Sequence, residues 1–119
     1  MTGTTRTETP IFTRTFDLLA WLLHATNDFP RAHRFSLTQR LLAAAFDLRE
    51  RLEEANLRHS AGRLERLARA DEALARVRVY LRLAVQLNWL TSGQYNHAAQ
   101  LTVEIGRLLG GWQRVTASS

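Results

Sequence analysis

The chain contains only two prolines, Pro10 and Pro30, and no cysteine. Around the prolines lie long stretches rich in Leu, Ala, Arg and Glu, which are good helix formers, and only six glycines interrupt them. The lack of cysteine excludes disulfide bonds, thiolate nucleophiles and the usual cysteine-containing zinc sites. We therefore expect an all-α fold that is stabilised by side-chain packing.

The length of 119 residues predicts one domain, residues 1–119, with flexible tails at 1–10 and 115–119. Hydrophobic residues make up 45% of the chain and charged residues 23%, which is a globular composition. No apolar run reaches the ~20 residues that a membrane-spanning helix needs, and residues 1–9 lack the apolar core of a signal peptide. The expected location is the cytoplasm, without membrane contact.

Apolar residues recur at helical spacing in four segments. The predicted helices cover residues 11–26, 37–56, 61–89 and 92–111. The connections between them are a few to ten residues long, and connections this short make neighbouring helices run in opposite directions. The sequence therefore predicts an antiparallel up-down-up-down four-helix bundle.

The expected helix ends come from capping residues. Ser36 and Gln39 have the spacing of a capping box at the start of the second helix, and Ser92 is the expected N-cap of the fourth. Gly110 and Gly111 are expected to mark the fraying end of the fourth helix, because glycine is a poor helix former.

The third predicted helix has no continuous polar face. Its first half carries charged residues on the outer side, but in its second half Val79 and Leu83 occupy the same direction. Leu42 and Phe46 likewise point away from the core stripe of the second helix. We expect these four residues to form an oligomer interface or to contact a partner. The alternative is a thicker core within one chain.

Arg78 and Arg82 are four residues apart and therefore lie side by side on the third helix, with Asp71 two turns earlier on nearly the same line. The weak hydration and fork geometry of arginine suit phosphate or carboxylate ligands. One interpretation is that both arginines bind a ligand. The other is that Arg78, or an arginine of a neighbouring subunit, pairs with Asp71.

All sixteen residues in the Lys and Arg count are arginine, and the formal net charge is +5. Codon usage in a GC-rich genome is an alternative explanation for the choice of arginine. Arg31, Arg34 and Arg40, together with His33, surround the first connection and are predicted to contact a nucleic-acid backbone. A second basic group, residues 58–69, is interspersed with glutamates and is interpreted as a solvated face.

No catalytic pattern is present in the sequence. It has no phosphate-binding glycine loop, no nucleophile elbow, no HExxH motif and no Glu-x-x-His pair of a di-iron bundle. We expect a protein that is not an enzyme and that has no catalytic residues, no metal site and no cofactor.

Several motifs resemble the Avd family, the accessory variability determinants of diversity-generating retroelements. They are the arginine-rich run at residues 74–84, Trp89-Leu90-Thr91 with Gln94-Tyr95, and the ending Glu104-Ile105-Gly106-Arg107-Leu108-Leu109-Gly110-Gly111-Trp112. Upstream, Phe29-Pro30-Arg31, Arg34-Phe35, Gln39-Arg40 and Asp71 are similar as well, so that the resemblance covers about residues 11–114.

The resemblance implies a four-helix bundle that assembles into a homopentamer and binds a reverse transcriptase together with RNA or DNA. It also implies a non-catalytic role in error-prone cDNA synthesis. Arg78 and Arg82 match the basic pair of the family, and Gly106 and Gly110 match positions where the fourth helix packs closely. The tail at 115–119 lacks the basic residues of many relatives, which implies weaker nucleic-acid binding.

A second resemblance leads to an alternative function. The four-helix-bundle proteins encoded in ribosomal-RNA intervening sequences are also similar, and membership there implies a structural homo-oligomer without a nucleic-acid role. A reverse-transcriptase gene and a template repeat beside this gene would distinguish the two.

Overall fold

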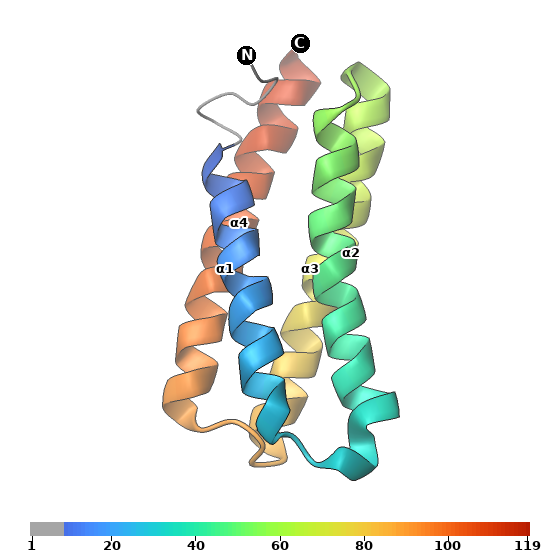
Figure 1. Ribbon diagram of the computed structural model, residues 1–119. Coiled ribbons are helices and arrows are strands. Elements are labelled where there is room, and N and C mark those ends of the chain that lie inside the picture. Colours follow the sequence, from blue (N-terminus) through green and yellow to red (C-terminus); the bar gives the residue numbers. More distant parts are fainter. Residues whose placement is uncertain (1–8) are drawn as a thin grey trace.

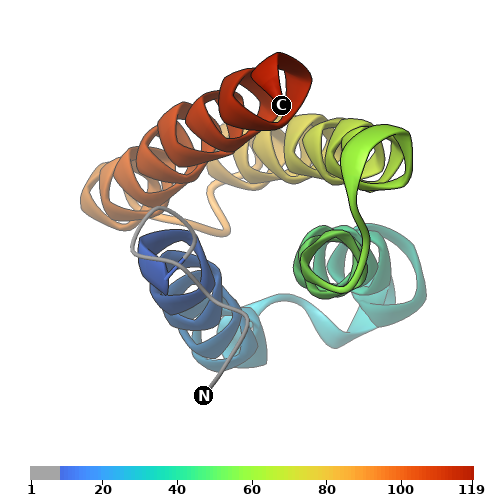
Figure 2. The same cartoon turned by 90° about the horizontal axis from the view of Figure 1, so that it is seen from above.

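The computed structural model describes residues 9–119, which form an antiparallel bundle of four α-helices (Figure 1). The helices are α1 (Thr9–Ala25), α2 (Gln39–Asn56), α3 (Ser60–Gln86) and α4 (Ser92–Ser118). Each helix packs against the next one along the chain and α4 returns against α1, so that the helices surround one core when seen from above (Figure 2). The predicted all-α, up-down-up-down fold is confirmed.

A stripe of buried side chains at spacings of three and four residues runs along each helix, which is why these segments are helical. The contact between α2 and α3 is the most extensive in the bundle. Small buried residues, including Ala44 and Ala45 on α2 and Ala70 and Ala73 on α3, let the two backbones approach closely. Trp112 of α4 fills the core beside Phe12 of α1, with ring centroids 6.0 Å apart.

The two ends of the bundle differ. The α1–α2 and α3–α4 connections lie together at one end, whereas the α2–α3 connection lies at the other, beside the C-terminus of α4 (Figure 1). We call the half of the bundle formed by residues 18–46 and 73–103 the connection end. None of the helices described over residues 9–119 combines the length and the apolarity needed to cross a membrane.

Between α1 and α2 the chain forms three short helical turns: η1 (Thr26–Asp28), η2 (Arg31–His33) and the π-helical turn η3 (Arg34–Thr38). The predicted capping box of Ser36 and Gln39 is wrong. An N-cap residue needs an extended backbone, but the chain is already helical before α2 begins at Gln39. The Ser36 hydroxyl donates instead to the carbonyl oxygen of His33, at 3.1 Å.

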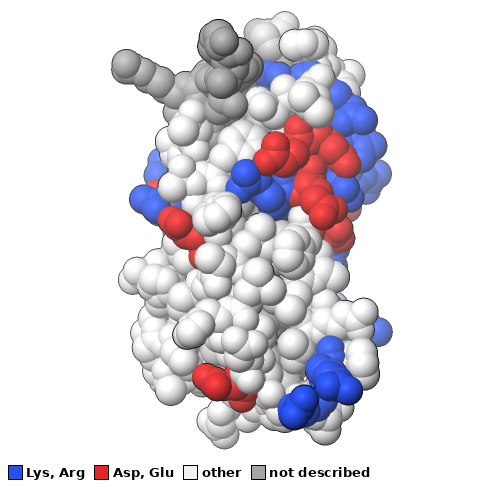
Figure 3. Space-filling view, viewed as in Figure 1, with Lys and Arg blue, Asp and Glu red and all other residues white. Residues whose placement is uncertain are grey.

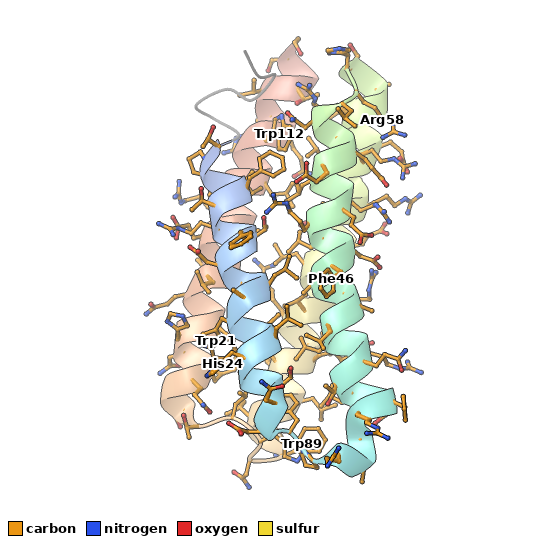
Figure 4. All side chains as sticks on the ribbon, viewed as in Figure 1. Trp21, His24, Phe46, Arg58, Trp89 and Trp112 are labelled. Carbon is orange, nitrogen blue, oxygen red and sulfur yellow. The ribbon has the colours of Figure 1, made fainter. Side chains whose placement is uncertain are left out.

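A Schellman motif ends α3. Asn88 adopts the left-handed conformation (φ 63°), which Asn tolerates better than most residues. The backbone N–H of Trp89 then donates to the carbonyl of Ala84 at 2.9 Å, and that of Asn88 to the carbonyl of Val85 at 3.0 Å. This turn fixes the position of Trp89 at the connection end (Figure 4).

The N-cap of α4 is Thr91 and not the predicted Ser92. The Thr91 hydroxyl accepts a hydrogen bond from the backbone N–H of Gln94 at 3.0 Å, and the Gln94 side chain accepts one from the N–H of Thr91 at 2.9 Å. The two bonds form a capping box one residue earlier than expected, because Thr91 has the extended backbone (φ −74°, ψ 164°) that a cap requires.

The predicted fraying of α4 at Gly110 and Gly111 is also wrong, since the helix continues to Ser118. Trp112 and Thr116 are buried beyond the glycines, so packing against the core maintains the helix there. Residues 115–118, expected in a tail, are therefore helical. Of the expected N-terminal tail, residues 1–8 lie outside the described part of the chain, and Thr9 and Pro10 begin α1.

Candidate nucleic-acid interface

The positive charge of the protein is concentrated at the connection end. Residues 18–46 and 73–103 contain six arginines and one acid, Asp28, which gives a formal charge of +5. The rest of the described chain contains nine arginines and nine acids and is formally neutral. The connection end therefore accounts for the whole net charge of +5. Its arginines are Arg31, Arg34, Arg40, Arg76, Arg78 and Arg82.

Ion pairing follows the same division. Within residues 9–119, Arg76 has an acidic partner at the middle of the bundle, Asp47, with Nη2 and Oδ2 3.2 Å apart, whereas the other five arginines of the connection end have none. In the opposite half, arginines and acids alternate over α2 and α3. Figure 3 shows this mixed cluster on upper α2 and a separate basic group below it, at the start of α2.

The pairs in the mixed cluster are close. Glu54 accepts hydrogen bonds from Arg51 of the same helix at 2.8 Å and from Arg66 of α3 at 3.1 Å. Burial is the largest single influence and acts to raise the pKa of Glu54, but the hydrogen bonds and the positive charges of Arg51 and Arg66 together outweigh it and hold the pKa below its ordinary value. Hydrogen bonds to Glu65 and Glu72 raise the pKa of Arg69. Five arginines of this half, Arg14, Arg49, Arg51, Arg66 and Arg69, thus pair with its acids, whereas Arg58, Arg107 and Arg114 have no acidic partner within residues 9–119.

Arg31, Arg34 and Arg40 lie together where the sequence places them, on the turns before α2 and on its first turn, and all three are exposed. The guanidinium of Arg34 lies 4.9 Å from the ring centroid of Phe35, a cation–π contact on the surface. Their side chains are thus available for phosphate.

Arg78 and Arg82 lie on the side of α3 that faces α4. Arg78 Nη2 donates to the carbonyl oxygen of Thr102 on α4, at 3.1 Å. The guanidinium occupies the space beside Gly106, where a β-carbon would lie 2.5 Å from Nη2. Arg82 is exposed, and no hydrogen bond from its side chain is formed within residues 9–119. Asp71 is likewise exposed and does not pair with Arg78 in the single chain.

The apolar residues of the predicted interface lie on two different faces. Phe46 and Leu42 share a stripe of α2 with Arg49, whose Nη1 donates to the carbonyl of Phe12, so this stripe lies on the α1 side of α2. Leu83 lies on the stripe of α3 that carries Arg76 and faces α2. The structure therefore does not bring the two pairs together.

Exposed apolar side chains nevertheless gather at the connection end. Val79 is 56% exposed and Leu83 43%, while Leu42 is half-buried. Seven of the ten large hydrophobic residues that are exposed belong to this end. They are Leu23, Phe35, Phe46, Val79, Leu83, Leu87 and Val103. A half that is both basic and apolar is suited to binding a charged partner with apolar parts.

A groove of about 540 Å³ lies between the start of α2 and the end of α3. Its lining is aromatic, apolar and basic: His33, Ser36, Leu37, Arg40, Tyr80, Leu83, Leu87 and Trp89. Sequence reasoning missed this groove, because its lining comes from two segments that are forty or more positions apart in the sequence. The available signal was the presence of His33 and Trp89 in the two connections. The centroids of the two rings are 5.1 Å apart.

The fold and this surface define a four-helix bundle with one basic, partly apolar end. Residues 11–116 match the model of the bAvd-like family, and the chain belongs to this family. The resemblance to the Avd family seen in the sequence is thereby confirmed.

A crystal structure of similar fold is described as a protein of unknown function from the S23 ribosomal protein family of Bacteroides thetaiotaomicron. The TM-score is 0.82, the match covers 91% of this chain and 98% of that chain, and the sequences are 15% identical. At this identity the likeness shows the fold alone. A comparison with curated proteins gave no match.

Proposed function

We propose that the protein is a non-enzymatic accessory protein of a diversity-generating retroelement, which binds the reverse transcriptase of that element and its RNA or cDNA. The observation that carries this proposal is the group of five arginines at the connection end that have no acidic partner within residues 9–119. Membership of the bAvd-like family supports it.

Unpaired arginines favour binding to a polyanion for two reasons. Each phosphate that an arginine neutralises releases condensed counterions, which adds affinity independently of base sequence. In addition, an arginine without a carboxylate partner loses no ion pair when it binds. Arg31, Arg34, Arg40, Arg78 and Arg82 meet this condition, whereas Arg66 and Arg69 do not.

The apolar residues support a second part of the proposal, a homo-oligomer, for which the family resemblance implies five subunits. Val79 and Leu83 on α3, and Leu42 and Phe46 on α2, supply two faces per chain. Two different faces are what a head-to-tail ring requires, since each subunit contacts one neighbour with each face.

The competing function is a structural homo-oligomer that does not bind nucleic acid. The bond from Arg78 to Thr102 favours it, because it gives one of the predicted ligand-binding residues a role within the fold. In that case the same apolar faces assemble the oligomer, but the unpaired arginines bind nothing.

Nucleic-acid binding at several salt concentrations tests the proposal. Fluorescence anisotropy with a labelled single-stranded RNA should give a log–log salt slope of about −3.5 for five phosphate contacts, at about −0.7 per contact. Changing Arg31, Arg34 and Arg40 together to Gln should make this slope shallower by about 2. The matched control is Arg66→Gln with Arg69→Gln, both in the mixed cluster, which should change the slope little.

Absence of RNA binding even at low salt would contradict the proposal and favour the structural oligomer. A separate arm tests the protein partner. The chain should co-purify with a reverse transcriptase encoded beside its gene, and a locus with neither that enzyme nor a template repeat speaks against an accessory role.

A further inference from the structure

The groove at the connection end has a lining that is unusual for this surface. Its lining combines aliphatic side chains, among them Leu37 and Leu87, with the rings of His33, Tyr80 and Trp89. Its volume of about 540 Å³ falls within the range of small-ligand pockets, about 300–1,000 Å³. A planar, largely apolar group fits such a lining.

The rings of His33 and Trp89 in the groove lining are held in place by the turns that flank them. Trp89 follows the Schellman motif of α3 and packs against two rings of the α1–α2 connection: its ring centroid is 5.4 Å from that of Phe29 and 5.1 Å from that of His33. The planes of His33 and Trp89 are inclined by 33°. The aromatic wall is therefore positioned by the α1–α2 and α3–α4 connections together, without any bound partner.

The charge around the groove narrows the class of ligand that the groove can bind. Arg40 lines it, and no acid does. Arg31 and Arg34 lie on the neighbouring turns, and Asp28 is the one acid of the connection end. The positive charge therefore favours a planar ligand that carries a negative charge beside its ring. A nucleobase attached to its phosphate is such a ligand.

We propose that this groove binds an unpaired nucleobase of a single-stranded nucleic acid, with an adjacent phosphate on Arg40. The proposal rests on the proposed function and makes it more specific. A duplex offers phosphates to the arginines but keeps its bases stacked, whereas a single strand can place a base between aromatic and aliphatic side chains. The protein should therefore prefer single strands.

The first test compares a short unstructured RNA with the same RNA annealed to its complement. The single strand should bind more tightly to the wild-type protein. His33→Ala should weaken single-strand binding about fivefold or more, the loss typical of one base stacked on one aromatic side chain, and should weaken duplex binding by a clearly smaller factor. His24→Ala is the matched control, because His24 is also an exposed histidine of the connection end, but lies outside the groove.

The second test locates the base by tryptophan fluorescence. Unlabelled single-stranded RNA should quench the emission of the wild-type protein, because a base enters beside Trp89. Trp89→Phe keeps an aromatic ring and removes that emission, so the quenching should be lost while RNA affinity is largely kept. Trp21 and Trp112 remain as reporters elsewhere, and quenching that persists in Trp89→Phe overturns the proposal.

A third measurement asks whether a second copy of the chain covers the groove, because Leu83 belongs both to the groove lining and to the proposed subunit interface. Leu87→Gln in the groove is compared with Leu23→Gln outside it, since the two leucines are 45% and 46% exposed. The proposal is overturned if Leu87→Gln lowers the mass of the assembly and leaves RNA affinity intact, while Leu23→Gln keeps the wild-type mass. The groove is then a subunit interface.

The remaining outcomes separate this inference from the proposed function. Equal binding of single strand and duplex, with no effect of His33→Ala, overturns the base site and leaves phosphate binding in place. If neither RNA binds, both proposals fall.

Discussion

At Gly106, the lack of a side chain leaves room for the guanidinium of Arg78, which reaches the carbonyl oxygen of Thr102 from there. This bond uses one N–H of a group that has five. The remaining donors of Arg78 are free to contact a phosphate while the first one holds the side chain against α4. The two roles considered for Arg78, within the fold and toward a ligand, are thus compatible.

Replacing Arg78 and Arg82 together by Gln should leave the fold intact and weaken RNA binding. Loss of one hydrogen bond to Thr102 costs about 1 kcal/mol, so the free energy of unfolding, measured with urea, should fall by about that amount. Loss of two phosphate contacts should make the salt slope of RNA binding shallower by about 1.4.

The control for this variant is Asp71→Asn. Because Asp71 is exposed and has no ion-pair partner within residues 9–119, the change should alter stability by less than about 0.5 kcal/mol. A loss of several kcal/mol, or of the assembly, would mean that Asp71 pairs with an arginine of a neighbouring subunit. Arg78 and Arg82 would then be withdrawn as binding residues.

At the scale of single elements, the start of α4 depends on the capping box of Thr91 and Gln94. Thr91→Ala removes the oxygen that accepts from the backbone N–H of Gln94 and should destabilise the protein by about 1 kcal/mol. Ser92→Ala, one residue further on, should have little effect. Urea unfolding curves of the two variants measure the difference, and a larger loss for Ser92→Ala would contradict the cap assignment.

The contact between α2 and α3 should weaken in acid. The pKa of Glu54 is lowered in the folded protein, so its contribution to stability is present above the pKa of the unfolded chain and is lost as the pH falls through the lower folded value. The difference in melting temperature between wild type and Glu54→Gln should be largest near neutral pH, should shrink as the pH falls below 4.5, and should disappear only below the lowered pKa of Glu54.

Glu50→Gln is the comparison, because Glu50 is more exposed than Glu54 and lies 3.6 Å from Arg51. The difference in melting temperature between wild type and Glu50→Gln should therefore change less with pH than that of Glu54→Gln. A melting temperature of Glu54→Gln that follows the wild-type curve at every pH would show that the pairs with Arg51 and Arg66 add no stability.

The helices could be predicted from sequence because apolar periodicity extends over many residues, but their ends could not. Whether Ser36 caps α2 depends on the backbone angles of one residue, and these are set by the π-helical turn in which it lies. Whether Gly110 ends α4 depends on what Trp112 contacts beyond it. Both outcomes are decided by packing, which a local pattern does not contain.

The candidate site divides in the same way. Arg31, Arg34 and Arg40 are close in the sequence, so their grouping was predictable. The groove required knowing that Trp89 and His33 meet across two connections, and the position of Arg78 required knowing that Gly106 lies opposite it. Contacts between distant segments depend on how each helix is oriented about its own axis. The apolar periodicity of the sequence determines this orientation only coarsely.

At the scale of the whole molecule, assembly should depend on the exposed apolar residues of α3. Val79→Glu places a charge where we propose that a neighbouring subunit packs, and an unpaired buried charge is strongly unfavourable. Light scattering should show a species of lower mass than the wild type. Leu57→Glu, on the α2–α3 connection at the opposite end, is the control and should keep the wild-type mass.

Two results would contradict this expectation. A Val79→Glu variant that keeps the wild-type mass would remove Val79 from the interface. A monomeric wild type would remove the interface altogether, together with the implied pentamer.

The separation of charge between the two ends gives the molecule an electric dipole along its longest dimension of 46 Å. A polyanion exerts a torque on such a dipole before any side chain touches it, so the protein should meet a nucleic acid end-on, with its turns foremost. In a closed ring whose bundles all point the same way, the dipoles add, and one rim of the ring becomes a circular cationic track. Such a track holds a strand by its curvature and its charge, and raising the salt concentration from 0.01 to about 0.1 M, which shortens the screening length from about 30 to about 10 Å, should abolish the orientation before it abolishes the contact.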